Sequence, residues 1–452
     1  MSYSQLKCFK AYDIRGRMPE QLNPEISYLI GCAYAEFIKP TQIAVGYDIR
    51  PTSSSLADSL TQGLIDSGVD VINIGVCGTE EVYFTTFNRK LDGGIMVTAS
   101  HNPIDYNGMK MVGKDARPIS SDTGLQQISQ LVEQKITPAA TLNKGSITYQ
   151  GNKQAFADYL LQFSDFTNLK KLKIVVNPGH SSAGLVIDLL EPHLPFELIK
   201  ICYEPDGTFP YGIPNPLLPE NRQLTADTVR ENNADLGIAF DGDFDRCFFF
   251  DATGEFIEGY YLVGLLAHTL LTNNRNGKVI YDPRLVWNTK DMVAQAGGVS
   301  LQSKAGHAFI KDAMRKNDAI YGGEMSAHHY FKEFAYCDSG MLPWLLLTKY
   351  LSENNISLKQ AVAQAIAKYP CSGEINFTVG NSQQLLANIQ QHYRPQNPKI
   401  DCTDGISAEF ADWRFNLRAS NTEPLIRLNI ETRKDKVLLE QKIQELTNLI
   451  QN

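Results

Sequence analysis

A strand–helix–strand pattern occurs three times along the chain, and it constrains the fold more than any other feature. At its first occurrence, Ile43–Asp48 reads as an apolar strand, and Pro51–Asp66 reads as a helix that Gly68 ends. Val69–Val76 then returns as a second strand. Two strands of one sheet that are joined through a helix run parallel, because the crossover brings the chain back to its starting end. The pattern therefore predicts an α/β domain near the N-terminus.

Two later stretches repeat this plan with different residues. The second has strands at Leu172–Asn177 and Phe196–Ile201, with a turn at Pro178-Gly179-His180 and a helix ending at Leu190. The third has strands at Lys278–Tyr281 and Val299–Gln302, with a turn at Asp282-Pro283 and a helix over Thr289–Gln295. Three such plans predict three α/β domains of related topology with mixed sheets. The alternative is independent use of a common unit.

Polar and turn-rich stretches separate these units. Thr137–Asn152 is polar and contains glycine, Asp251–Gly254 is a turn, and Tyr369–Gly373 ends the third unit. Beyond it, strands are predicted at Glu374–Val379 and Asp412–Leu417. An apolar stripe then predicts a C-terminal helix, through Leu439, Ile443, Leu446 and Ile450. We expect α/β domains at residues 1–148, 149–251 and 252–368, and a smaller α+β domain at residues 369–452.

Composition limits the class of protein and its partners. Of the 452 residues, 43% are hydrophobic and 20% are charged, as in a globular chain with a large core. The net charge of −8 argues against nucleic acid or an acidic membrane as a partner. The eight cysteines form no CxxC pair, no hydrophobic signal opens the sequence, and the most apolar stretch, Tyr260–Leu271, is too short to cross a bilayer. We expect a cytoplasmic protein; the sequence does not indicate its oligomeric state.

Ser100 stands near the end of the stretch Gly94–Pro103. The apolar run Ile95–Val97 predicts a buried strand, and the polar segment after it must leave the sheet. We therefore expect Ser100 on an exposed loop, where His101 and Asn102 flank it and its oxygen can face a ligand. An ordinary polar turn is the alternative.

Three carboxylates follow the apolar strand Leu236–Phe240 at spacings of two residues. They belong to Asp241, Asp243 and Asp245. Oxygen ligands converging where a strand ends suit a hard cation, and Mg²⁺ fits better than Ca²⁺. An EF-hand is excluded because Arg246 and Ala252 stand where that loop needs glycine and glutamate. Arg246 can neutralise the acids or hold a phosphate. A solvated acidic turn is the alternative.

Two further stretches carry groups that suit a sugar phosphate. Glu324 and Ser326, at a strand end, can bracket a sugar diol. The loop Arg418–Pro424 offers a guanidinium, two hydroxyls, an amide and backbone N–H donors to a phosphate, although a capping turn would look similar. Arg427 lies on the next strand.

Several isolated basic residues and histidines have a structural interpretation as well as a functional one. Arg15 and Lys110, which follows an expected turn at Asn107-Gly108, are surface charges unless they meet a ligand. His307 is a candidate for proton transfer. The pair His328-His329 has no second Cys/His pair at ligand spacing, which argues against zinc.

With these residues assembled, the chain resembles the α-D-phosphohexomutase superfamily, over the range from Tyr12-Asp-Ile-Arg-Gly16 to the Arg418 loop. The resemblance implies four domains around a central cleft, each supplying one loop. It implies a phosphoryl group on Ser100 and Mg²⁺ held by Ser100 and the three aspartates. It also implies that Glu324 and Ser326 bind sugar hydroxyls, while the non-reacting phosphate is bound by Arg418, Ser420, Asn421 and Thr422.

Further positions match the superfamily's active site. Catalytic roles are expected for Arg15, Lys110 and His307, with Lys110 or His307 as the general base. A lysine in that role needs its pKa lowered by cations such as Arg15 or Arg246. The remaining expected substrate-binding residues are Tyr12, His101, Asn102, Arg246, Arg284, Lys304, His328 and Arg427.

The chain departs from common members at a few positions. Phe244 and Ala327 stand where glycine is frequent, and Tyr211-Gly212 stands where Asn-His is often seen. Phe244 is expected to put a bulky ring inside the metal loop. None of these departures removes a ligand.

The expected reaction interconverts mannose 6-phosphate and mannose 1-phosphate through a sugar 1,6-bisphosphate, with glucose phosphates as slower substrates. The Glu324-Met-Ser326 triplet favours this over phosphoglucosamine mutase activity, and phosphoglucomutase activity is a near alternative. A phosphoserine-dependent sugar phosphatase and a non-catalytic sugar-phosphate-binding protein are rivals from other classes.

Overall fold

The computed structural model describes residues 6–139, 143–419 and 425–451. It divides into two compact units. Unit 1 comprises Met1–Phe256 and Glu333–Asn355, and unit 2 comprises Ile257–Lys332 and Ile356–Asn452. The segment Glu333–Asn355 therefore belongs to unit 1, although unit 2 supplies the chain on either side of it.

Three sheets share one strand plan. The first has the order β1-β5-β4-β2-β3-β6, the second β11-β10-β9-β7-β8, and the third includes β13-β12-β14-β15. In each, the first strand of a strand–helix–strand unit lies between two parallel neighbours, and an antiparallel strand follows on one side. The expectation of related α/β domains with mixed sheets is confirmed.

The strands have the following bounds: β1 Ile14–Arg17, β2 Gln42–Tyr47, β3 Asp70–Val76, β4 Gly93–Val97, β5 Tyr106–Gly113, β6 Ile147–Tyr149, β7 Lys173–Asn177, β8 Glu197–Lys200, β9 Leu236–Phe240, β10 Cys247–Asp251, β11 Phe256–Ile257, β12 Lys278–Tyr281, β13 Val299–Gln302, β14 Tyr321–Gly323, β15 His329–Phe331 and β16 Cys337–Asp338.

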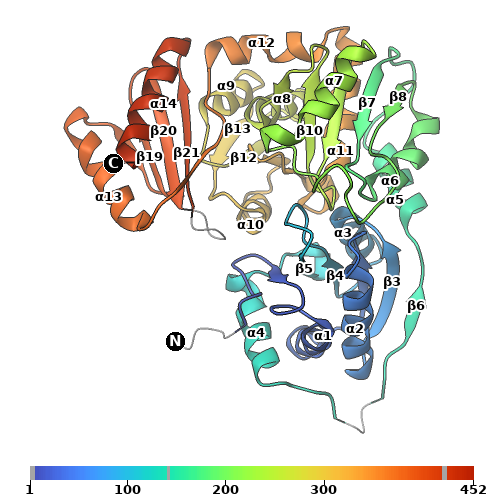
Figure 1. The fold of residues 1–452 in the computed structure, drawn as a ribbon. Coiled ribbons are helices and arrows are strands. Elements are labelled where there is room, and N and C mark those ends of the chain that lie inside the picture. Colours follow the sequence, from blue (N-terminus) through green and yellow to red (C-terminus); the bar gives the residue numbers. More distant parts are fainter. Residues whose placement is uncertain (1–5, 140–142, 420–424, 452) are drawn as a thin grey trace. The chain divides into compact units, whose positions relative to one another are not determined.

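Alternating side chains let the first sheet build a core on both faces. Ile43 and Val45 of β2 belong to one apolar cluster, whereas Ala44 between them belongs to another. The first cluster contains residues of α1 (Pro24–Ile38), α2 (Ser53–Asp66) and α4 (Gln126–Glu133). The second contains Val82 of α3 (Thr79–Asn88). Figure 1 accordingly shows α3 on one side of this sheet and α1, α2 and α4 on the other.

The remaining helices are divided between the two units. In unit 1 they are α5 Lys153–Leu161, α6 Ala183–Leu190, α7 Gln223–Glu231 and α11 Met341–Asn354. In unit 2 they are α8 Gly259–Thr272, α9 Trp287–Gln295, α10 His307–Asn317, α12 Leu358–Lys368, α13 Ser382–Tyr393 and α14 Lys436–Gln451. No described helix is both long and apolar enough to span a membrane.

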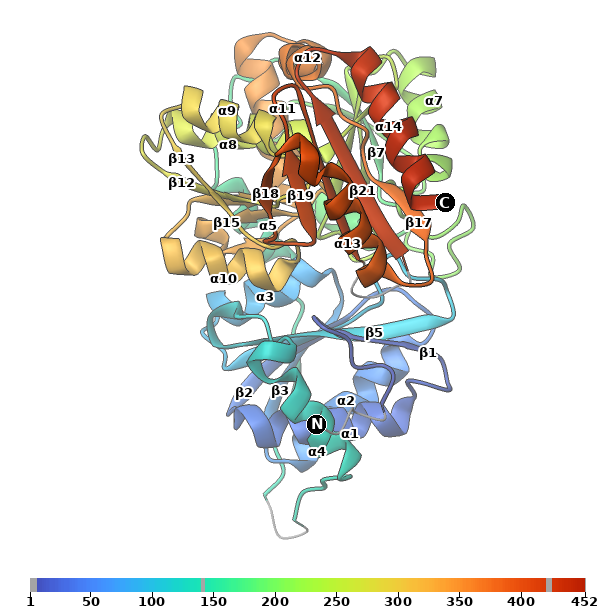
Figure 2. The same cartoon turned by 90° about the vertical axis from the view of Figure 1, so that its left-hand side faces the viewer.

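The last sheet is wholly antiparallel, in the order β17-β21-β20-β19-β18. Its strands are β17 Ile375–Thr378, β18 Lys399–Asp401, β19 Ile406–Glu409, β20 Trp413–Ala419 and β21 Leu425–Thr432. Figure 2 shows α13 and α14 on one face of it, where Ile389, Leu439, Leu446 and Ile450 join its apolar core. This is the expected α+β domain.

One local expectation was incomplete and another was wrong. Thr137–Asn152, expected as a linker, also contains the short strand β6, which pairs with β3 as an edge strand of the first sheet. Asn107 and Gly108 were expected as a turn but lie inside β5. Gly108 faces Arg15 of β1, and a Cβ there would lie 2.0 Å from the Ile14 carbonyl oxygen. This glycine therefore serves close strand packing, and the Asn-Gly pair is not a turn signal here.

Candidate active site

Three of the expected functional loops occupy equivalent places in the first three sheets. In the first three, each loop joins the last parallel strand to its antiparallel neighbour: residues 98–105, 241–246 and 324–328. In the fourth sheet, Arg418 is near the end of β20, just before the connection to β21. One topological position thus supplies Ser100, the aspartates and Glu324, whereas Arg418 comes from the wholly antiparallel sheet.

Ser100 itself is buried, with 3% of its surface exposed, although the loop that carries it is largely exposed, as expected. Arg50 holds this loop: its guanidinium donates to the carbonyl oxygens of Ser100 (2.9 Å), Asn102 (2.6 Å) and Pro103 (2.8 Å). Arg50 was not among the expected site residues. No local pattern indicated it, because the nearest backbone acceptor that this buried arginine uses lies 50 residues away in the chain.

The Ser100 side chain faces the acidic loop. Its Oγ donates to Asp241 Oδ2 at 2.8 Å and lies 3.1 Å from His101 Nδ1. Ser100 has a φ of 49°, in the left-handed region. A non-glycine residue held in this region is strained, and such strain is common at functional sites.

Basic side chains surround the acidic loop. Lys110 of β5 contacts Asp243 Oδ2 at 2.6 Å and Asp245 Oδ2 at 2.5 Å. Arg246 donates to Asp241 Oδ2 through Nε at 2.8 Å. The aspartates are therefore paired with cations, and the loop is no solvated acidic turn.

The pKa of Lys110 is shifted in the opposite direction to the one that a general base needs. Burial lowers it, but the attraction of Asp243 and Asp245 outweighs burial and raises the pKa above its ordinary value, despite Arg15. Arg15 does lower this pKa, but the two carboxylates outweigh it, so the net lowering that a general base needs is not met in the arrangement described. In this arrangement Lys110 remains a charged ammonium.

The aspartates fit a divalent cation. One oxygen each of Asp241, Asp243 and Asp245 lies within 4.8 Å of the others, and all three residues are buried. Asp243 Oδ1 is buried and has no hydrogen-bond partner among the described residues. A buried carboxylate oxygen left without a donor is costly unless a cation meets it. Oxygen-only ligands of this kind suit Mg²⁺.

The Phe244 ring was expected inside the metal loop, but it lies elsewhere. Its ring is fully buried and packs against Gly78, where a Cβ would lie 2.2 Å from Phe244 Cε1. Its φ of 44° is left-handed, which explains why glycine suits this position in other chains. Ala327, the other departure from glycine, has a φ of 69°. This φ is also left-handed, so glycine suits that position in other chains for the same reason.

In unit 2, Arg284 organises the Glu324 loop. It contacts Asp282 at 2.8 Å, Glu324 at 3.4 Å and Ser326 Oγ at 3.2 Å. Glu324 Oε1 also accepts from the Gly306 N–H at 2.7 Å, which joins this loop to the Lys304–His307 turn. Burial raises the pKa of Glu324, although Arg284 opposes the rise.

Arg418 belongs to a cluster that the sequence did not reveal. Glu374 is contacted by Arg418 at 3.1 Å, by Arg427 at 3.5 Å and by Arg284 at 3.7 Å. Burial raises the pKa of Glu374, but the three guanidinium groups outweigh it and hold the pKa below its ordinary value. Ser420, Asn421 and Thr422 lie outside the described residues.

The other expected residues fall into the same two groups. In unit 1, Arg15 donates to Asn102 Oδ1 at 2.9 Å, and Tyr12 is half-buried just before β1. In unit 2, His328 Nδ1 lies 3.4 Å from Ser326 Oγ, and His307 begins α10. His329, in contrast, is fully buried against the hydroxyl of Tyr321.

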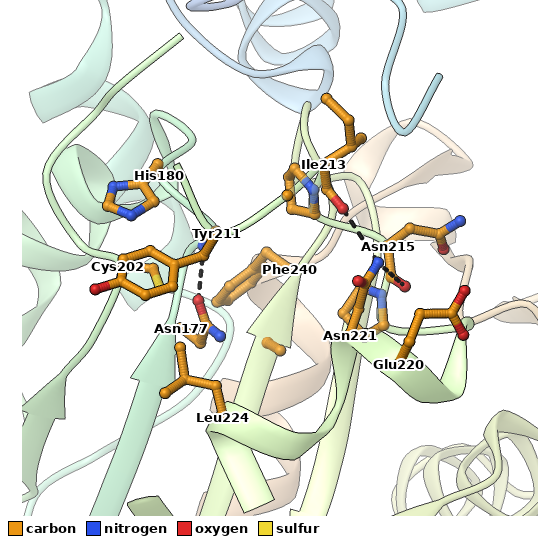
Figure 3. A pocket seen from close by; sticks show the side chains of 15 residues that line it. Asn177, His180, Cys202, Tyr211, Ile213, Asn215, Glu220, Asn221, Leu224 and Phe240 are labelled. Atoms are coloured by element: carbon orange, nitrogen blue, oxygen red, sulfur yellow. Dashed lines mark hydrogen bonds between the residues drawn. The ribbon is translucent and has the colours of Figure 1, made fainter. Parts of the chain in front are cut away.

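A separate cavity lies at the carboxyl ends of β7 and β9 (Figure 3). Phe240 and Leu224 line it, and the ring of Tyr211 stacks on His180 with centroids 5.7 Å apart. None of the expected site residues lines this cavity. Tyr211, one of the chain's departures, therefore belongs here.

Comparison with known families accounts for nearly the whole chain. The phosphoglucomutase/phosphomannomutase family matches with its α/β/α domain I at residues 6–138, domain II at 154–254 and domain III at 258–369. Its C-terminal domain matches residues 374–448.

Individual relatives agree with this match. Phosphohexose mutases of Xanthomonas campestris pv. campestris are 56% identical over 445 residues, covering 98% of this chain and 99% of theirs. A phosphomannomutase of Escherichia coli is 54% identical over 454 residues, covering 99% and 100%. A crystal structure of a phosphoglucomutase/phosphomannomutase family protein from Burkholderia thailandensis superposes with a TM-score of 0.89 at 27% identity, covering 99% and 97%.

Proposed function

The chain belongs to the phosphoglucomutase/phosphomannomutase family, and on that premise we propose that it is a phosphomannomutase working through phosphorylated Ser100. It interconverts mannose 6-phosphate and mannose 1-phosphate. The observation that carries the proposal is the contact of Ser100 Oγ with Asp241 at 2.8 Å, amid buried acids and bases. A serine so placed can carry a phosphoryl group beside a cation site.

The reaction takes two phosphoryl transfers. A free sugar hydroxyl attacks phospho-Ser100, so that the new O–P bond forms as the serine O–P bond breaks, and the hydroxyl proton passes to a base. The resulting sugar 1,6-bisphosphate then returns its other phosphoryl group to Ser100. Added bisphosphate therefore acts as an activator, because it phosphorylates Ser100.

The residues of unit 1 serve charge neutralisation more than covalent chemistry. Mg²⁺ bound by Asp241, Asp243, Asp245 and the Ser100 phosphate would neutralise the transferred group. Arg246 adds positive charge beside Ser100, and Arg15 adds it beside Asn102 of the same loop. Lys110 can act as the base only after its ammonium has left Asp243 and Asp245 and has lost a proton; otherwise His307 serves as the base.

Unit 2 would bind the parts of the substrate that do not react. Glu324 and Ser326 accept and donate hydrogen bonds to adjacent sugar hydroxyls, and Arg284 holds both side chains in place. Arg418 and Arg427 both contact Glu374. In the proposed reaction they bind the distal phosphate together with Ser420, Asn421 and Thr422. Lys304 and His328 complete the proposed contacts of this unit. Tyr12, His101 and Asn102, which belong to unit 1, are proposed to bind substrate as well.

The cellular setting follows from the chemistry of the cysteines. All eight are free thiols, several of them buried, which is the usual condition in a reducing compartment. We assign the enzyme to the cytoplasm on this basis.

Arg418→Ala should raise KM by about 10- to 100-fold, because one charge-assisted hydrogen bond to phosphate is worth roughly 1.5–3 kcal/mol. The value of kcat should change less, since the distal phosphate is bound in ground state and transition state alike. Steady-state kinetics with mannose 1-phosphate measures both. Arg394→Ala, an exposed arginine of the same unit, is the control. An unchanged KM with a severely reduced kcat would place Arg418 beside the reacting phosphate.

A coupled assay with mannose 1-phosphate and glucose 1-phosphate tests the function. The two sugars differ only at C2, and the intermediate must bind in two orientations, so a close C2 contact in one pose is misplaced in the other. We expect a preference for mannose of about 10- to 100-fold in kcat/KM, the range for weak selection. A ratio above about 10⁴ would require a dedicated C2 contact. Steady release of inorganic phosphate without isomerisation would instead identify a phosphatase.

A further inference from the structure

The metal loop is held differently from its counterparts. In the first and third sheets, an arginine two residues after an aspartate follows the central strand and holds the functional loop: Arg50 for Ser100 and Arg284 for Glu324. The equivalent turn of the second sheet, Pro178-Gly179-His180, has no arginine. The loop at residues 241–246 must therefore be positioned from elsewhere.

The N-terminal turn of α3 supplies that support. The Thr79 N–H donates to the Asp243 carbonyl oxygen at 3.1 Å, and Thr79 Oγ1 donates to Asp243 Oδ2 at 2.5 Å. The adjacent Gly78 leaves room for the Phe244 ring, which packs directly against it. The backbone and the side chains of the metal loop thus both contact Gly78 and Thr79, at the N-terminus of α3, which packs on the first sheet.

This turn is itself rigidly held. The Gly78 N–H donates to Glu81 Oε2 at 2.8 Å, and Lys153 contacts Glu81 at 2.9 Å. Glu80 accepts from the Met341 N–H at 3.2 Å, which ties the turn to α11. Thr79, Glu80 and Glu81 are all fully buried. The position of Thr79 is therefore also fixed by contacts of its own turn that do not involve Asp243.

The two oxygens of Asp243 are in unlike surroundings. Oδ2 accepts from Thr79 Oγ1 and from Lys110 Nζ, whereas Oδ1 is buried without a partner among the described residues. A carboxylate held at one oxygen presents the other in a defined direction. Partners of this kind orient metal ligands and set metal affinity.

We propose that Thr79 is a positioning residue for the metal site, which fixes the carboxylate of Asp243 so that Oδ1 is presented to the divalent cation. The proposal rests on the metal site assigned above. It adds that metal affinity depends on a hydroxyl donor that touches neither metal nor substrate. When Lys110 leaves Asp243, Thr79 is the remaining donor to Oδ2 shown by the described contacts.

Thr79→Val removes the hydroxyl and keeps the branched shape, while Thr79→Ser keeps the hydroxyl and loses a methyl group. Mn²⁺ binding to the metal-free protein, followed by electron paramagnetic resonance, measures affinity without turnover. We expect Thr79→Val to weaken Mn²⁺ binding by roughly 10- to 100-fold, the usual range for such partners. Thr79→Ser should lose less than about tenfold. The Mg²⁺ concentration for half-maximal activity should shift in parallel with Mn²⁺ affinity.

Comparing Mn²⁺ binding by the parent protein and by Asp243→Asn shows whether a negative result refutes the role of Thr79 or the assignment of the metal site. If the parent does not bind Mn²⁺, or Asp243→Asn binds it equally well, the metal site itself is wrongly assigned. If Asp243→Asn loses binding while Thr79→Val keeps the parent affinity, the role of Thr79 is refuted. Equal losses in Thr79→Val and Thr79→Ser would also refute it, because packing would then be the cause. Should Thr79→Val fail to fold by circular dichroism, Thr79→Ala against Thr79→Ser decides the same question.

Discussion

Ser100→Ala should lower kcat/KM on the order of 10³-fold or more, because the transferred phosphoryl group has no other carrier in the proposed reaction. The fold should survive. The clamp by Arg50 uses the Ser100 carbonyl oxygen, which alanine keeps, and alanine tolerates the left-handed φ about as poorly as serine does. The bisphosphate-primed mutase assay measures the loss.

Ser27→Ala is a matched control for this substitution. Ser27 is also fully buried in unit 1, and its Oγ donates to the Leu56 carbonyl oxygen, away from the acidic loop. Mass spectrometry should find phosphate on Ser100 of the parent protein and none on the variant. Activity of Ser100→Ala within about tenfold of the parent would remove Ser100 from the role of phosphoryl carrier.

Removal of the divalent cation should abolish turnover, and added Mg²⁺ should restore it. Asp243→Asn should behave like the metal-free enzyme, with a loss on the order of 10²-fold or more, because metal-assisted charge stabilisation is worth several kcal/mol. The substitution keeps the size of the side chain but removes the charge. Burial raises the pKa of Asp243, yet Lys110 and Arg15 outweigh burial and hold the pKa below its ordinary value, so the native group is a carboxylate.

Asp235→Asn is the control for the metal experiment. This aspartate stands just before β9, is exposed, and accepts from the Lys173 N–H. Its loss should leave the Mg²⁺ dependence of the rate unchanged. Normal turnover by chelator-treated protein, verified as metal-free by elemental analysis, would contradict the role assigned to the three aspartates.

Local patterns in the sequence were enough for the α/β plan and for the positions of most of the candidate loops. Lys278–Tyr281 and Leu236–Phe240 were predicted with the bounds that the structure shows. Apolar runs of this length, bounded by turn residues, are determined by neighbours in the chain. The spacing of Asp241, Asp243 and Asp245 likewise needs no distant partner to be recognised, because one strand end places all three.

Only the tertiary structure decided which residues support those loops. Arg50, Thr79 and Glu374 stand 50, 164 and 44 residues from Ser100, Asp243 and Arg418, and no local pattern links them. The burial of Ser100 and the raised pKa of Lys110 depend on the same long-range contacts. A hydrogen bond or an ion pair depends on distance in space, whereas a sequence pattern records only distance along the chain.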